Sequence, residues 1–245
     1  MLVGTADVNA LAAGAAEVAA FHPQAIELTD VVCFQLTAEM RNSAREAVLP
    51  PGLHPTIPPA LSVQVFEVGG SPWGAFHLAT VRVSCRSGVR ARGFMRGSLV
   101  SSDAACQGLR DTLGFPARRG EIAFRHGYDG VSVAVVGGGT DVLRIEAIDP
   151  EPMASDDVQY TGSLNLAHTP LGLRLMQVEM NVQATQVDRL TARLEAFDGA
   201  AWGDRLLVPS RVIAATVSRL DATFPPVRFV CRPDELAFTG TEAVG

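Results

Sequence analysis

The chain has 245 residues, of which 47% are hydrophobic and 19% are charged. These proportions are typical of a globular protein with a sizeable core, and the length suits one large domain or two small ones. The net charge of −6 at pH 7 argues against a nucleic-acid partner, and the densest basic stretch, residues 86–92, is more simply explained as a solvated hairpin turn. No run of about 18 apolar residues occurs, so we expect no membrane-spanning segment.

Cysteine usage favours a reducing environment. The four cysteines are far apart and form no C-x-x-C pair. The Ala-rich stretch at 6–20 contains acidic residues and lacks the basic leader of a signal peptide. We therefore expect a cytoplasmic protein without a structural zinc site.

Two helices are predicted in the first fifth of the chain. Residues 6–20 predict a surface helix that ends near Pro23. The β-rich run at 25–36 leads into a helix expected at 38–48, which Pro50 terminates.

Strand patterns dominate the rest of the chain. The run that begins near Phe76 alternates well and places Ala75, His77 and Ala79 on one face. The glycine-rich residues 137–140 join two β-rich runs, so they predict a hairpin turn rather than a phosphate-binding loop. The predicted strands lie at 61–68, 76–85, 89–100, 122–124, 131–136, 142–148, 162–168, 172–183 and 190–198, and a short helix is expected at 210–215.

A helix with well-marked ends is predicted directly after the strand at 89–100. Asp103 suits the N-cap position, and Leu109 and Leu113 recur at helical spacing. Gly114, followed by Pro116, stops the helix.

The segment from this helix to Gly120 resembles the active-site segment of the acetoacetate decarboxylase family, written D-x-A…G-R-E-x-x-G-[FY]-P-K-K. Gly114-Phe115-Pro116 matches, and Arg110-Asp111 stands where the family has Arg-Glu. The resemblance follows the family order over about residues 25–235. It implies an α+β fold, a strongly bent β-sheet or barrel-like cone with flanking helices that encloses a cavity, and a homo-oligomer. We assign residues 1–24 to a helical extension and 25–245 to a single domain.

The chain departs from the family where the family does its chemistry. Ala117-Arg118 stands where the family has two lysines, the first of which forms an imine with the substrate. Lys and Arg together number 20, and all of them are arginines. A guanidinium stays protonated and is a poor nucleophile, so it cannot replace the lysine amine. The family glutamate of Gly-Pro-Tyr-x-Glu falls on Ala75, and an early family arginine has no counterpart.

Three side chains are candidates for chemistry, each with a simpler alternative. His77 shares a strand face with Ala75 and would move a proton, unless it is a satisfied core histidine. Arg118 would supply a fixed positive charge, unless it is a surface arginine. Glu179 lies on a polar face with Gln177 and would orient the substrate, unless that face is solvated.

Further residues are expected to line the cavity, and some expectations are negative. We assign Trp73 and Met95 as apolar walls, although such residues more often belong to the core. Ala75 and Ala117 either enlarge the cavity or let neighbouring side chains collapse into it, and Gln177 would contact the substrate. We expect no metal and no cofactor, because no H-x-x-x-H pair or other ligand motif occurs.

These features lead to two hypotheses about function. The first is a lysine-independent, non-decarboxylating enzyme that catalyses a cyclisation, dehydration, isomerisation or pericyclic step on a β-dicarbonyl or polyketide-like small molecule. The second is a non-catalytic protein that binds a small molecule or serves in assembly on the same fold. Neither hypothesis involves nucleic acid or a membrane.

Overall fold

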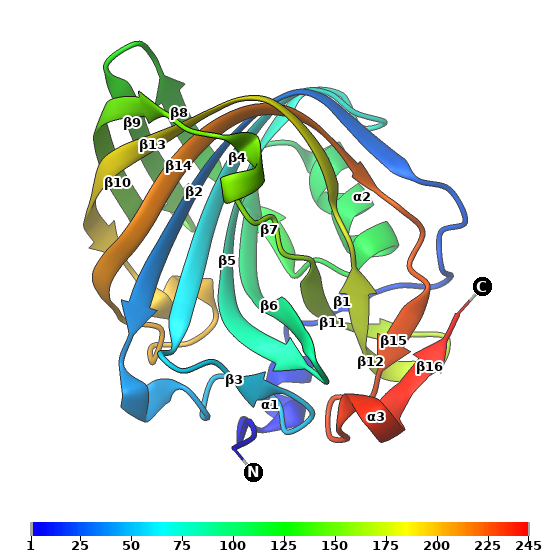
Figure 1. The fold of residues 1–245 in the computed structure, drawn as a ribbon. Coiled ribbons are helices and arrows are strands. Elements are labelled where there is room, and N and C mark those ends of the chain that lie inside the picture. Colours follow the sequence, from blue (N-terminus) through cyan, green and yellow to red (C-terminus); the bar gives the residue numbers. More distant parts are fainter. Residues whose placement is uncertain (1, 245) are drawn as a thin grey trace.

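The structure, a computed structural model, describes residues 2–244 (Figure 1). Within them one strongly bent sheet of 16 strands carries the fold, and only short helices accompany it. The elements follow in this order: α1 (Val8–Ala12), β1 (Ala16–Glu17), β2 (Ile26–Met40), η1 (Asn42–Ala44), β3 (His54–Pro55), β4 (Ala60–Gly70), β5 (Phe76–Ser87), β6 (Arg90–Val100), α2 (Asp103–Leu113), β7 (Ala117–Arg119), β8 (Glu121–His126), β9 (Gly130–Gly137), β10 (Thr140–Pro152), η2 (Ser155–Asp157), β11 (Ser163–Thr169), β12 (Gly172–Val178), β13 (Asn181–Phe197), η3 (Gly199–Trp202), β14 (Pro209–Phe224), β15 (Phe229–Cys231), α3 (Ala237–Gly240) and β16 (Thr241–Ala243).

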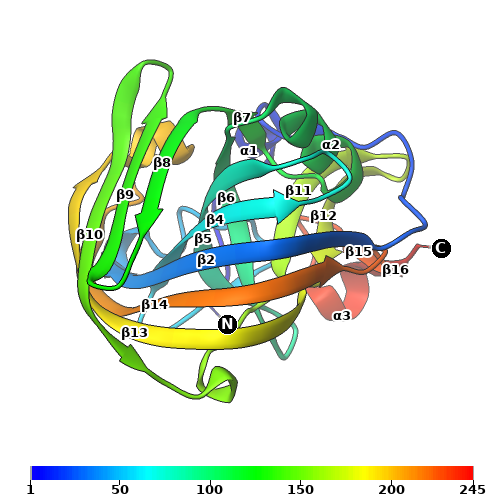
Figure 2. The same cartoon turned by 90° about the horizontal axis from the view of Figure 1, so that it is seen from above.

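The sheet is bent like a cone but does not close into a barrel. Its strands are hydrogen-bonded in the order β16-β15-β12-β11-β6-β5-β4-β2-β14-β13-β10-β9-β8. The long strands β2, β13 and β14 run side by side along one flank, and β8 to β10 curl over at the far end (Figure 2). This architecture confirms the predicted α+β fold with a bent sheet and flanking helices.

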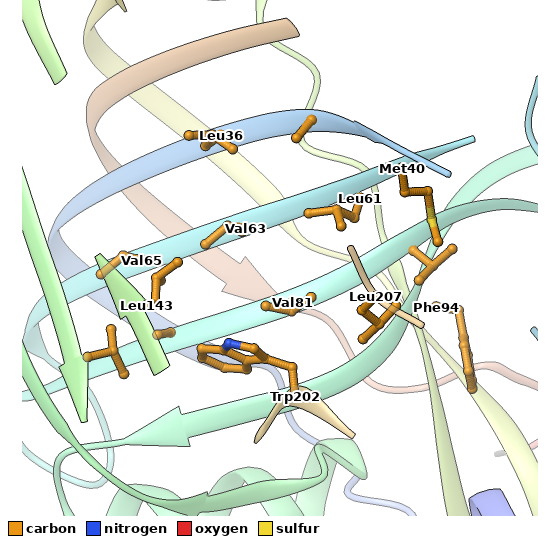
Figure 3. Packing of buried hydrophobic residues seen from close by; sticks show 14 of the residues in the cluster. Leu36, Met40, Leu61, Val63, Val65, Val81, Phe94, Leu143, Trp202 and Leu207 are labelled. Atoms are coloured by element: carbon orange, nitrogen blue, oxygen red, sulfur yellow. The ribbon is translucent and has the colours of Figure 1, made fainter. Parts of the chain in front are cut away.

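Strand alternation divides the interior into two cores on opposite faces of the same strands. In β5, Ala79 and Val81 face the first core, whereas Phe76 and Leu78 face the second. Trp202 of η3 is completely buried in the first core, beneath β2, β4 and β5 (Figure 3). The second core is covered by α2, which contributes Ala105, Cys106, Leu109 and Leu113.

The structure corrects three helix predictions. The helix expected at 38–48 is wrong, because β2 continues to Met40 and pairs there with both β4 and β14, leaving only the short η1 turn. The helix expected at 210–215 is wrong as well, because those residues belong to β14, which pairs with β2. In place of one helix over 6–20, α1 covers five residues and β1 pairs with β11. In each case strand pairing outweighs local helix propensity.

No helix among residues 2–244 is long and apolar enough to cross a membrane.

Candidate functional site

A row of polar residues crosses the second-core face of the sheet. The register places Gln35 of β2 beside Gln64 of β4, Gln64 beside Thr80 of β5, and Thr80 beside Ser98 of β6. Ser98 lies in turn beside Ala117 of β7. Gln64 donates to Gln35 over 2.5 Å, whereas the buried hydroxyls of Thr80 and Ser98 have no hydrogen-bond partner. The row therefore ends at Ala117, the position that the resemblance matches to the imine-forming lysine.

Arg82 lies two residues beyond Thr80 on β5 and faces the same core. Its side chain is buried, and one Nη donates to the carbonyl oxygen of Thr161 over 2.9 Å. Its Nε is buried without a partner, and within residues 2–244 no carboxylate forms an ion pair with it. Burial lowers the pKa of Arg82 to about 10, so the group still carries its charge near neutral pH. A buried, unpaired cation is costly, and this makes Arg82 the electrostatic centre of the site.

The cavity in front of Arg82 is small, with a volume of about 20 Å³. Large side chains occupy the space, and Phe115 makes an edge-on contact with Phe224 at 6.3 Å between ring centroids. Little free space therefore remains in front of Arg82. The lining residues are Gln64, Phe66, Leu78, Thr80, Arg82, Met95, Phe115, Thr161, Gly162, Ser163, Val178, Met180 and Phe224.

Helix α2 delivers the family segment to this site. The Ser102 side chain caps its N-terminus, one residue before the predicted Asp103, and Gly114 ends it in the left-handed conformation at φ 65°. A Cβ on Gly114 would lie 2.7 Å from the Met176 sulfur, so the turn tolerates only glycine. The buried Asn165 amide donates to the carbonyl of Leu113 over 2.8 Å and holds the helix end against β11.

The segment that joins β10 to β11 crosses in front of the sheet and covers the second-core face (Figure 1). Three contacts hold it there. Arg82 donates to Thr161, Gln35 donates to the carbonyl of Gln159 at 3.4 Å, and the Tyr160 hydroxyl donates to Ser218 at 2.5 Å. Thr161 and Gly162, at the end of this segment, form part of the cavity wall.

His77 points away from this cavity. It shares the face of Ala79, opposite to Leu78, Thr80 and Arg82. Its Nε2 lies 3.9 Å from the Glu67 carboxylate, and His126 Nε2 lies 3.5 Å from the same oxygen. The structure thus groups His77 with Glu67 and His126 on the other side of the sheet.

Arg118 and Glu179 also lie outside the cavity lining. Arg118 is exposed and donates to the carbonyl of Ala201. Glu179 forms ion pairs with Arg92 and Arg90, while its neighbours Val178 and Met180 line the cavity. The three residues predicted to do chemistry are therefore separate from one another and from Arg82.

The predicted lining residues divide into two groups. Met95 lines the cavity, and Ala117 is buried in the same core beside Ser98. Trp73 packs over Gly108 of α2, where a Cβ would come within 2.1 Å of its indole nitrogen. Ala75 is exposed before β5 begins, and Gln177 is half-buried on β12 beside Leu164.

Sequence reasoning missed Gln64, Thr80, Arg82 and Ser98. The pattern that reveals them is the even-numbered face of β5, where Thr80 and Arg82 interrupt an otherwise apolar strand. The turn motif before β5 points to Ala75 and so to the odd-numbered face, which lies on the other side of the sheet. No group of three or more His, Cys, Asp or Glu able to hold a metal ion occurs within residues 2–244.

A model of the acetoacetate decarboxylase (ADC) family matches residues 12–223. The protein therefore belongs to the acetoacetate decarboxylase family. A search of curated proteins finds no match.

Solved structures share the fold at low identity. The acetoacetate decarboxylase of Legionella pneumophila is similar with a TM-score of 0.74 and 15% identity, covering 86% of this chain and 88% of that one. The enduracididine biosynthesis enzyme MppR, in complex with the condensation product of pyruvate and imidazole 4-carboxaldehyde, has a TM-score of 0.67 and 16% identity, covering 83% and 87%. An acetoacetate decarboxylase-like enzyme from Sphingomonas wittichii RW1 has a TM-score of 0.64 and 13% identity, covering 84% and 93%. The family fold is thus found in a biosynthetic enzyme as well as in decarboxylases.

Proposed function

We propose that the protein is a lysine-independent, non-decarboxylating enzyme that binds a β-dicarbonyl or polyketide-like small molecule against Arg82. The observation that carries this proposal is a buried guanidinium that has no acidic partner within residues 2–244 and lines a cavity of the second core. Two oxygens of an enolised 1,3-dicarbonyl match the planar fork of an arginine.

The chemistry follows from the charge of Arg82. For a substrate already in its enol form, a cyclisation or pericyclic step moves the proton and electron pairs between atoms of the substrate itself, and a fixed cation beside the dicarbonyl oxygens stabilises the partial negative charge that builds up on them. The hydroxyls of Thr80 and Ser98 would donate further hydrogen bonds. Neither a carboxylate nor an imidazole lines the cavity, so a step within the substrate, such as a cyclisation or pericyclic rearrangement, suits it better than one that needs a protein base.

Substrate entry requires the cavity to open. Met95 and Met180 are the adaptable lining residues, because an unbranched thioether side chain changes its conformation easily. A substrate oxygen that binds Arg82 would also replace the carbonyl of Thr161, which loosens the part of the wall formed by Thr161 and Gly162. Substrate binding and opening of the cavity are therefore coupled through the Arg82 guanidinium.

The experiment compares wild type with Arg82→Met, Arg118→Met and His77→Ala. Each purified protein is incubated with a panel of 1,3-diketones, β-keto acids and polyketide-like enones, and products are identified by mass spectrometry. We expect conversion by wild type, Arg118→Met and His77→Ala, and none by Arg82→Met. Conversion that survives in Arg82→Met, or that is lost in His77→Ala, would overturn the assignment.

A second candidate is a non-catalytic binding protein on the same cavity. The cavity lining favours it, because no carboxylate or imidazole among the lining residues is available to move a proton. Binding of 1,3-diketones that depends on Arg82 but leaves every compound unchanged would select this alternative. The enolate absorbance of a bound cyclic 1,3-diketone measures such binding directly.

A further inference from the structure

A second and larger pocket lies on the other face of the sheet, at the open end of the first core. Its volume is about 390 Å³. Four apolar side chains form its floor, and the turn between β8 and β9 forms one wall. We call it the mouth pocket, and its lining residues are Val32, His126, Gly127, Tyr128, Gly130, Val131, Pro150, Pro152, Gln186, Asp188, Leu190, Val217, Ser218 and Arg219.

Strand register explains how Asp188 comes to lie in this floor. Asp188 of β13 stands beside Pro152 of β10 on one side and Val217 of β14 on the other. Leu190 follows two residues later on the same face, buried in the first core. The carboxylate is therefore set among apolar neighbours.

This carboxylate lacks the partner that a buried charge requires. Asp188 is 9% exposed, and one oxygen accepts a hydrogen bond from the Gln186 side chain over 2.7 Å. Within residues 2–244 no arginine or histidine forms an ion pair with it. A buried carboxylate without a cation is costly, and a ligand that supplies the cation recovers that cost.

The rim of the mouth pocket adds contacts of a different kind. Tyr128 is 99% exposed at the tip of the turn and offers a flat aromatic face. Arg219 of β14 is exposed beside Gln186 of β13 and Val32 of β2, where solvent screens its charge. His126 stands at the edge, beside Glu67.

We propose that the mouth pocket binds a small organic amine, with the protonated nitrogen against Asp188 and the apolar body over Val32, Leu190 and Val217. The charged nitrogen makes a charge-assisted hydrogen bond with the carboxylate, and the volume admits a ligand the size of a bicyclic aromatic amine. This site is independent of Arg82 and of the proposed reaction.

The test uses tryptamine as probe and tryptophol, its neutral isostere, as control in isothermal titration calorimetry. We expect wild type to bind tryptamine at least about tenfold more tightly than tryptophol, because only the amine pairs with the carboxylate. Asp188→Asn should remove this preference and leave tryptophol binding unchanged. Arg219→Gln removes a positive charge from the same rim and should keep or strengthen the preference for tryptamine.

Amide chemical shifts locate the bound probe. We expect tryptamine to perturb the signals of Gln186, Asp188 and Val217 and to leave those of Thr80 and Arg82 unchanged. Equal affinity of wild type for tryptamine and tryptophol would by itself overturn the proposal. A folded Asp188→Asn variant that still prefers tryptamine would overturn it as well.

Discussion

The two hollows of this protein lie on opposite faces of the sheet, one mainly against β4 and β5 and the other mainly against β10, β13 and β14, and they differ in size and charge. The second-core cavity is nearly filled by side chains, has a volume of about 20 Å³ and holds a cation without an acid. The mouth pocket is open, about 390 Å³ in volume, and holds a carboxylate without a cation. A bent sheet with two buried faces thus carries two unpaired charges of opposite sign.

The difference shows how burial and openness set the cost of a charge. Arg82 is enclosed and its Nε has no partner, so the fold bears its full desolvation cost. Asp188 faces a pocket that water can enter, so its cost is smaller. The closed cavity is accordingly suited to an anion that becomes charged during a reaction, and the open pocket to a ligand that arrives already charged.

The strongest way to break this comparison is to put a lysine into the closed cavity. Ala117 is 2% exposed and lies beside Ser98 at the end of the polar row. Ala117→Lys would bury an amine at the end of the polar row, and burial lowers a lysine pKa. We expect a loss of several kcal/mol in the free energy of unfolding and a new ability to form an imine with acetoacetate.

Borohydride trapping and intact-protein mass spectrometry measure that imine. Wild type and Ala117→Met, which has a side chain without an amine, should show no adduct. Arg118→Lys places a lysine on the exposed neighbouring position and should not react either. Equal trapping at both lysines would mean that the cavity does not activate the amine.

A second prediction compares the thiols of the two cores. Burial raises the pKa of Cys33 in the second core and of Cys85 in the first from 9.0 to about 12. The unfolded chain loses these protons near pH 9, whereas the native protein keeps them, so their stabilisation is complete below pH 9 and is lost as pH rises towards 12. Each thiol contributes a slope of about 1.4 kcal/mol per pH unit.

Urea unfolding at pH 8 and at pH 10 tests this expectation. The two thiols together should lower the free energy of unfolding by about 3 kcal/mol between the two values. Cys33→Ala should reduce this decrease by about 1.4 kcal/mol, whatever it does to stability at pH 8. A slope that is unchanged in Cys33→Ala would show that the thiol does not stay protonated in the second core.

The sequence was sufficient for most strands and for α2, because alternation and capping are local patterns. It was not sufficient for β14, whose residues 210–215 adopt a strand only because β2 lies alongside. The family segment around Ala117 can be read from the sequence, but Arg82 cannot be singled out, since its importance depends on what surrounds it. Nothing in the sequence near Asp188 indicates that Pro152 and Val217 will flank it, because β10 and β14 are brought there by the sheet.

Removing each charge in turn sharpens the comparison between the closed and the open hollow. Arg82→Met replaces the buried cation with an apolar side chain. It should raise the free energy of unfolding by about 1–3 kcal/mol, a net value that includes the loss of the hydrogen bond to Thr161. Asp188→Leu should change it by less than about 1 kcal/mol, because water already reaches the open pocket. Chemical denaturation measures both. If Asp188→Leu raises the free energy of unfolding as much as Arg82→Met does, the two charges are equally dehydrated.

A further effect on stability is expected at Thr80, in the middle of the polar row. Its hydroxyl is buried without a partner, so Thr80→Val removes an unsatisfied polar group at constant shape and should stabilise the fold by about 1 kcal/mol. Thr80→Ser keeps the hydroxyl, removes a buried methyl group and should destabilise the fold by a similar amount. The two variants separate the cost of the hydroxyl from the packing of the methyl group. If Thr80→Val is less stable than wild type, the hydroxyl has a partner in solution, and a water bound between Thr80, Ser98 and Arg82 is then the group that a substrate oxygen would replace.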